Sequence, residues 1–191
     1  MNEERPLAYG AALLSLCRCI ARTALLLTRH RILLPRDRVG VRLRFADGTS
    51  ARVYRETVVR DLAVRDPCVL VVAFRLRGVR GAGHALFRRE SLLNTPLFVG
   101  FPGFVSKLWM AADEQGRYRG LYEWDGAARA EHYARSLWRV LALVSVPGSI
   151  HFRVLPAEHR TPLLHGERTG PDADPATEAS SWWRPVGTES S

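Results

Sequence analysis

The chain has 191 residues, of which 47% are hydrophobic and 25% are charged, the ordinary balance of a globular domain. Its formal net charge is +9, and arginine supplies all of the 28 basic residues except Lys107. An odd count of 3 cysteines does not indicate a disulfide framework. These values exclude a coiled coil, a disulfide scaffold and a wholly disordered chain, and the length suits one domain with appended segments.

Residues 7–30 have the pattern of a broadly apolar helix. Ser15, Arg18, Arg22 and Arg29 fall on one stripe about 60° wide at helical spacing. Such a narrow polar stripe favours burial of the helix against protein, with attachment to a membrane surface as the alternative. The apolar run is interrupted by arginine and is too short to span a bilayer. The chain start lacks the basic region of a secretory signal, so we expect a cytoplasmic protein.

Two alternating segments, 39–45 and 51–59, flank an Asp-Gly pair at 47–48. This pattern predicts a β-hairpin with a tight turn. We expect the hairpin to add to a larger sheet or to lie beside it. With the preceding helix it makes an N-terminal extension of residues 1–60.

Residues 67–156 make up a second unit whose predicted elements follow the order β-α-β-β-α-β. That order is the ferredoxin-like motif, so the predicted fold class is α+β. The segment 157–191 is rich in Pro, Gly, Ser and acidic residues and is expected to be a mobile tail, with Trp182 and Trp183 as a local anchor. The predicted elements of the second unit are a strand at 68–76, a helix at 84–93, a hairpin of strands at 104–112 and 117–125, a helix from 125 to 146 and a strand at 149–155.

Two stretches of the second unit carry a family resemblance. They are Gly-Phe-Val-Ser-Lys-Leu-Trp-Met at 103–110 and Gly-Arg-Tyr-Arg-Gly-Leu-Tyr-Glu-Trp at 116–124. They resemble the dimeric α+β barrel superfamily, and within it the small monooxygenase-like proteins of the YdhR type. The pattern departs at Arg119, which replaces the first glycine of the usual pair, and at Gln115, which precedes the turn glycine. The N-terminal 60 residues have no counterpart in that family.

The resemblance implies a homodimer whose sheets enclose ligand cavities, with the N-terminal extension as another element that could close the sheet. It also implies a monooxygenase that oxidises a phenolic or enol-rich substrate with molecular oxygen and without a cofactor. The superfamily hosts many other activities, so fold is the firmer inference.

The register of the central hairpin determines which side chains meet. Pairing Ala112 with Arg117 places Lys107 opposite Tyr122, Val105 opposite Trp124 and Trp109 opposite Gly120. One sheet face then carries a lone amine among aromatic rings, and it is either the wall of a cavity or the core of a dimer. We expect the helices to pack on the other face. The aromatic face comprises Lys107, Trp109, Tyr118, Tyr122 and Trp124, and the other face comprises Ser106, Leu108, Met110, Leu121 and Glu123.

Lys107 and Tyr122 are the predicted catalytic pair, because an amine and a phenol side by side can stabilise a substrate oxyanion. His84, at a helix start, and His151, in the last strand, are candidates for moving the proton. The predicted substrate-binding residues are Trp109, Trp124, Tyr118 and Phe104.

Other classes of site are not indicated. No histidine pair stands with a carboxylate at metal-ligand spacing, and there is no dinucleotide-binding glycine motif or P-loop, so we predict neither a metal nor a cofactor. Arg75, Arg77 and Arg80 lack the interleaved aromatic residues of a nucleic-acid surface.

The sequence therefore predicts a cofactor-independent enzyme, monooxygenase-like or a cyclase or isomerase, acting on a hydrophobic oxygenated small molecule. A polyketide-type metabolite of secondary metabolism is one such substrate. The alternative is a non-enzymatic dimer that binds a hydrophobic ligand, held near a membrane by residues 7–34; peripheral membrane contact is the less favoured interpretation of that segment.

Overall fold

The computed structural model describes residues 7–78, 95–167 and 181–189. The predicted helix at 84–93 lies outside these residues. The described elements are α1 (Tyr9–Thr28), β1 (Ile32–Leu33), β2 (Arg42–Phe45), β3 (Ser50–Val59), β4 (Pro67–Arg75), the 3₁₀ helix η1 (Thr95–Leu97), β5 (Phe104–Met110), β6 (Arg117–Asp125), α3 (Ala127–Val144), β7 (His151–Pro156), α4 (Arg160–Leu164) and β8 (Pro185–Glu189).

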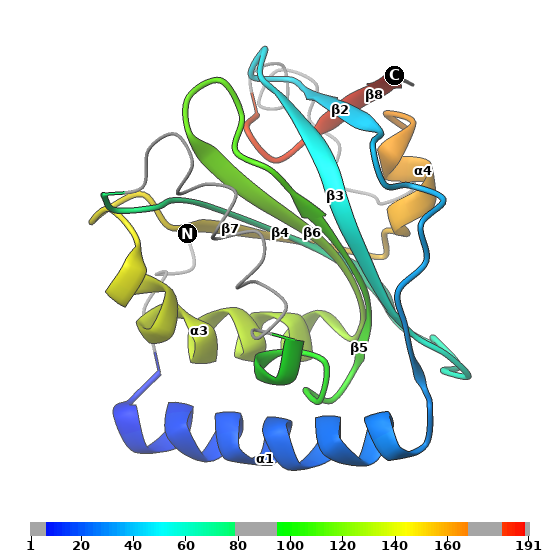
Figure 1. Ribbon diagram of the computed structural model, residues 1–191, viewed down its shortest axis with the longest axis vertical. Helices are drawn as coiled ribbons and strands as arrows, with labels where there is room; N and C mark the ends of the chain where they lie inside the picture. The colour runs from blue at the N-terminus through cyan, green and yellow to red at the C-terminus, as the bar shows by residue number, and fades with distance from the viewer. Residues whose placement is uncertain (1–6, 79–94, 168–180, 190–191) are drawn as a thin grey trace.

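The centre of the fold is an antiparallel sheet in the order β7-β4-β6-β5. This is the strand order expected when a β-α-β-β-α-β chain places its two crossovers on one side. α3 lies along the sheet and contacts β4, β6 and β7 (Figure 1). The predicted α+β class with a ferredoxin-like arrangement is confirmed.

The N-terminal hairpin continues this sheet. β3 pairs with β5, β2 pairs with β3, and β8 completes the far edge, giving an eight-stranded sheet that curls strongly (Figure 1). Of the two positions expected for the hairpin, the structure shows addition to the sheet. The C-terminal segment from 157, for which the sequence predicted a mobile tail, contains α4 and the edge strand β8.

The two faces of the sheet have separate hydrophobic cores. The inner face, which carries Leu70, Val72, Tyr122 and Trp124, packs against α3 through Tyr133 and the small side chains of Ala130 and Ala134. The outer face packs against α4, β2 and Trp183; its core includes Val69, Val71, Leu108, Met110, Leu121, Leu163 and Leu164.

This arrangement corrects the predicted use of the faces. The helices were expected on the face of Leu108 and Leu121, but α3 covers the aromatic face of Lys107 and Tyr122. The face of Leu108 is instead covered by segments that precede and follow the ferredoxin-like unit. The prediction assumed that only helices would bury the aliphatic side chains, but a curled sheet buries them against its own edge strands and the chain end.

Arg119 joins two distant turns and the C-terminal segment on the outer face. Its guanidinium donates to the carboxylates of Asp113 at 2.6 Å and Asp47 at 2.7 Å, to the hydroxyl of Thr49 at 2.8 Å and to the carbonyl of Trp182 at 3.0 Å. These groups belong to the β5–β6 turn, the β2–β3 turn and the C-terminal segment. Arg119 therefore binds the two segments that extend beyond the ferredoxin-like unit.

α1 is much less buried than its composition suggested. It contacts α3 and η1 through a narrow stripe in which only Ala12, Cys19 and Thr23 are buried. Gly100 allows the helix this approach, since a Cβ there would lie 1.9 Å from the carbonyl oxygen of Cys19. The expectation that the apolar surface of this helix would be buried against protein is wrong for most of its circumference.

Candidate active site

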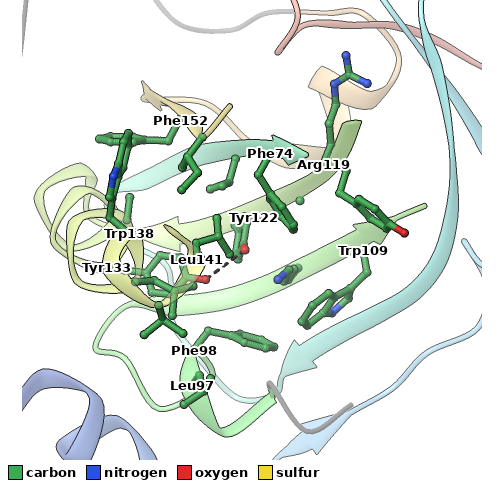
Figure 2. A pocket seen from close by; sticks show the side chains of 18 of the residues that line it. Phe74, Leu97, Phe98, Trp109, Arg119, Tyr122, Tyr133, Trp138, Leu141 and Phe152 are labelled. Atoms are coloured by element: carbon green, nitrogen blue, oxygen red, sulfur yellow. Dashed lines mark hydrogen bonds between the residues drawn. The ribbon is translucent and has the colours of Figure 1, made fainter. Parts of the chain in front are cut away.

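A cavity of about 160 Å³ lies between the inner face of the sheet and α3 (Figure 2). Its walls are apolar and aromatic, with side chains from β3, β4, β5, β6, η1, α3 and β7. Arg119 also borders the cavity, but Figure 2 shows its guanidinium pointing away from it. The other larger side chains of the wall include Tyr54, Phe74, Phe98, Lys107, Trp109, Met110, Tyr118, Tyr122, Tyr133, Leu137, Trp138, Leu141 and Phe152.

Lys107 is the amine that lines this cavity. β5 places it opposite Tyr122 of β6 and Thr57 of β3, and its side chain is only 6% exposed. Its Nζ lies 3.1 Å from the ring centroid of Trp109, 4.5 Å from that of Tyr122 and 4.7 Å from that of Phe98. Within the described part of the wall there is no carboxylate and no imidazole.

The surroundings of Lys107 favour its neutral form. Burial lowers the pKa of Lys107 well below its usual value of 10.5, and the positive charge of Arg55 lowers it further. An ammonium without a carboxylate in a dry site is destabilised, so the amine can act as a proton acceptor. Once protonated, it would be held by the faces of the three surrounding rings.

Two buried tyrosines form the donor side of the cavity. The hydroxyl of Tyr133 on α3 donates to the hydroxyl of Tyr122 over 3.1 Å, and Figure 2 marks this bond. Burial raises the pKa of both phenols above their usual value of 10.0, so both remain protonated. Because Tyr122 accepts from Tyr133, its own proton is available to an oxygen atom in the cavity.

The indole of Trp109 is held by a hydrogen bond at its N–H and by side chains that contact its ring. Its N–H donates to the hydroxyl of Thr57 at 3.2 Å. The guanidinium of Arg55 lies 4.0 Å from the ring centroid, and Phe98 packs edge-on at 5.1 Å. A ring held in this way provides a rigid wall for a flat ligand.

The structure brings four of the predicted site residues to the cavity. Lys107 and Tyr122 lie side by side as the register predicted, and Trp109 and Tyr118 line the same wall. Trp109 lies opposite Gly120, also as predicted. A Cβ on Gly120 would lie 2.8 Å from the ring of Tyr122, so the absence of a side chain there lets that ring pack flat on the strand.

The other predicted site residues lie elsewhere. Trp124 and Phe104 are fully buried behind the cavity, where they pack edge to face at 5.6 Å. Phe104, and not Val105, lies opposite Trp124, because an irregularity between Phe104 and Ser106 shifts the register. His151 is exposed, and the centroid of its ring lies 6.0 Å from that of Trp182.

Strand alternation explains the position of His151. Its neighbour Phe152 lines the cavity, so the histidine side chain points to the outer face. The structure does not bring this histidine to Lys107, and it is not a proton carrier for this cavity. His84 lies outside the described residues.

The sequence interpretation missed the contribution of α3. Tyr133, Leu137 and Leu141 recur every four residues and present one face of the helix to the cavity. Leu137 and Leu141 have the spacing of an ordinary helix core, and extending this spacing backwards by one turn reaches Tyr133. Residues of β4 and η1, including Phe74 and Phe98, had no local signal that separated them from ordinary core.

The described side chains do not form a metal site. In residues 7–78, 95–167 and 181–189, no group of three or more His, Cys, Asp or Glu side chains is arranged to hold a metal ion. The chemistry offered by the described cavity is therefore that of an amine, phenols and aromatic walls.

No protein-family model and no curated protein matches the chain. Among solved structures, an uncharacterized ferredoxin-fold protein from Listeria monocytogenes 4b F2365, described as related to antibiotic biosynthesis monooxygenases, is 14% identical with a TM-score of 0.40, over 59% of this chain and 66% of that one. An anthrone oxidase-like protein is 16% identical with a TM-score of 0.39, over 58% of this chain and 55% of that one. The chain thus spans under two thirds of each of these proteins, and the likeness concerns the fold alone. The similarity to YdhR-type proteins stays a prediction.

Proposed function

We propose that the chain is a cofactor-independent enzyme that removes a proton from a hydrophobic, oxygenated small molecule and directs the resulting anion to react with molecular oxygen. The observation that carries this proposal is the environment of Lys107, a buried amine among aromatic rings with no carboxylate in the described cavity wall. Such an amine is a base whose strength is set by exclusion of water.

The proton transfer uses the groups on the two sides of the cavity. The neutral Nζ of Lys107 accepts the proton of a phenolic or enolic substrate. Tyr122 donates a hydrogen bond to the substrate oxygen, and Tyr133 supports it through the 3.1 Å bond between the two hydroxyls. The new ammonium and the new oxyanion then stabilise each other in a site of low polarity.

The oxidation step requires only the substrate and oxygen. In a substrate whose ring carries an activated methylene, the carbon gives up four electrons and its two hydrogens. One oxygen atom becomes the carbonyl oxygen on that carbon, and the other leaves as water. A cyclisation or isomerisation would begin with the same deprotonation, so Lys107 and Tyr122 serve each of these reactions.

The size of the cavity limits the substrate. A cavity of about 150 Å³ in another protein holds one benzene molecule, and the cavity here is about 160 Å³. We therefore propose that one aromatic ring of the substrate sits between Trp109 and α3, and that additional rings extend beyond the space enclosed by the described residues.

The proposal is tested by native mass spectrometry of the purified chain, followed by oxygen uptake with a panel of single-ring and fused-ring phenols. We expect an organic ligand that is released on denaturation, and oxygen consumption that does not require added metal or flavin. Bound haem or flavin, or tight ligand binding without turnover across the panel, would contradict the mechanism. The second result would favour the ligand-binding alternative, and the same spectra test the predicted homodimer.

Replacing Tyr133 with phenylalanine is expected to lower turnover by about tenfold, the value of one neutral hydrogen bond of about 1.4 kcal/mol. The variant removes the donor to Tyr122 and keeps the ring that packs on Trp124 at 4.9 Å. The measurement is kcat at saturating substrate. Leu137→Met, on the same wall of the cavity, is the control and should change kcat little; an equal loss in both variants would indicate a general packing effect.

A further inference from the structure

α1 presents a wide apolar surface to solvent. Leu13 is 64% exposed, Leu14 52% and Leu27 53%, with Ile20 and Leu25 between them. At about 100° per residue these side chains cover an arc of about 160° on the side of the helix away from Ala12, Cys19 and Thr23. Figure 1 shows the helix along the lower edge of the molecule, with α3 and η1 on one side only.

The charged side chains that α1 itself carries are all positive. Arg18, Arg22 and Arg29 are exposed along one border of the arc. No aspartate or glutamate occurs anywhere in residues 7–36. Beyond the helix, Leu34 is 54% exposed and Arg36 is also exposed.

From this pattern we propose that α1 binds the surface of an anionic lipid bilayer, lying in the membrane plane with its leucines among the acyl chains and its arginines at the phosphates. Apolar side chains flanked by arginine are what such a surface recognises, because burial of the leucines and attraction of the cations act together. The +9 charge of the whole chain acts in the same direction.

The packing of α1 favours lying on the bilayer over crossing it. By length and composition alone, α1 is long and apolar enough to cross a membrane, although the sequence analysis expected it to be too short. Only 17% of its most apolar stretch is buried in the protein. The buried stripe of Ala12, Cys19 and Thr23 nevertheless packs closely on the protein, with the backbone of Cys19 against Gly100. Ser15 also forms a 3.2 Å hydrogen bond with His132 of α3. A crossing helix would have to give up these contacts.

A second copy of the chain fits the same surface less well. Arg18 lies at the midpoint of α1, so a twofold pair of antiparallel helices would bring Arg18 and Arg22 of both copies together. Neither helix offers a carboxylate to pair with them. A bilayer containing anionic lipids supplies that negative charge.

The test is flotation of the full chain with phosphatidylcholine vesicles, with and without phosphatidylserine. We expect binding to the anionic vesicles that weakens with salt. Substituting glutamine at both Arg18 and Arg22 should reduce the binding by about thirtyfold, or about fivefold for each arginine. The pair Leu14→Gln and Leu25→Gln should reduce it by at least about tenfold.

Leu143→Gln is the matched control, because Leu143 is 78% exposed on α3 and lies outside the apolar arc. It should leave vesicle binding unchanged. All of these positions are exposed, and circular dichroism checks that the variants fold. The proposal would be overturned if the chain did not bind anionic vesicles. It would also be overturned if the Leu14→Gln, Leu25→Gln double variant bound them as well as the Leu143→Gln control does. A dimer in solution that the Leu14→Gln and Leu25→Gln changes dissociate would overturn it too, because α1 would then bind a second copy of the chain.

Discussion

Replacing Lys107 with methionine is expected to lower turnover by a factor of about 10² to 10⁴, the usual contribution of a positioned general base. The binding of an apolar ligand and the fold should remain intact, because methionine fills a similar volume among Trp109, Phe98 and Tyr122. The measurement is kcat and ligand affinity with the phenol identified by oxygen uptake. Turnover that survives the change would remove Lys107 from the mechanism.

Leu141→Met provides the matched control for this variant. It places the same thioether in the same cavity, on α3, and leaves the amine in place. Loss of turnover in Lys107→Met together with its retention in Leu141→Met would assign the effect to the amine.

The stability of the Lys107→Met variant gives an independent check on the buried amine. In the folded chain burial, and then Arg55, hold the pKa of Lys107 well below 10.5. Between that lowered pKa and 10.5 the unfolded chain binds more protons than the folded chain, so the stability of the native protein rises with pH. The variant lacks this slope. Urea denaturation should show the variant as the more stable protein at low and neutral pH, with the difference narrowing towards pH 10.5.

Replacing Arg119 with glycine, the residue usual in the resembling family, is expected to destabilise the chain by about 3–5 kcal/mol. The change leaves the carboxylate of Asp113, whose side chain is 0% exposed, without its 2.6 Å partner. It also removes the bond to Asp47 and the bond to the Trp182 carbonyl. Urea denaturation measures the loss, and limited proteolysis should show faster cleavage within 157–191.

Arg129→Gln is the control for Arg119→Gly. Arg129 pairs with Asp125 on the surface, where its side chain is 55% exposed, and such a pair contributes about 0–1 kcal/mol. If Arg119→Gly lowered the free energy of unfolding no more than this control does, the segments outside the ferredoxin-like unit would not depend on the hydrogen bonds of Arg119.

Local patterns in the sequence predicted the parts of the fold that local physics determines. The turn at 113–116 fixes the hairpin register, so the pairing of Lys107 with Tyr122 followed directly. The same counting failed at the start of β5, on the N-terminal side of Ser106. An irregularity there places Phe104, and not Val105, opposite Trp124. A bulge of this kind depends on how the strand bends to meet its neighbours, which no short pattern records.

Burial of the two faces depends on tertiary contacts that a periodic pattern does not contain. Both faces of β4 are apolar, so its pattern does not indicate which face meets α3. The spacing of Tyr133 is that of the neighbouring core residues of α3, so the pattern could not distinguish a cavity residue from a core residue. The apolar surface of α1 was expected to be buried because apolar helices usually are, but its outer half has no protein neighbour among the described residues.

The outer face of the sheet is covered by residues that lie before and after the ferredoxin-like unit, from Leu43 and Phe45 at one end to Leu163 and Trp183 at the other. We therefore expect that the unit does not fold as an autonomous domain. A fragment of residues 67–156, cut at the boundaries that the resemblance suggests, would leave Val69, Val71, Leu108 and Leu121 open to water. Association with another copy through that face would be the simplest way for such a fragment to cover it. In the 191-residue chain the segments before and after the unit cover this face in place of a neighbouring subunit.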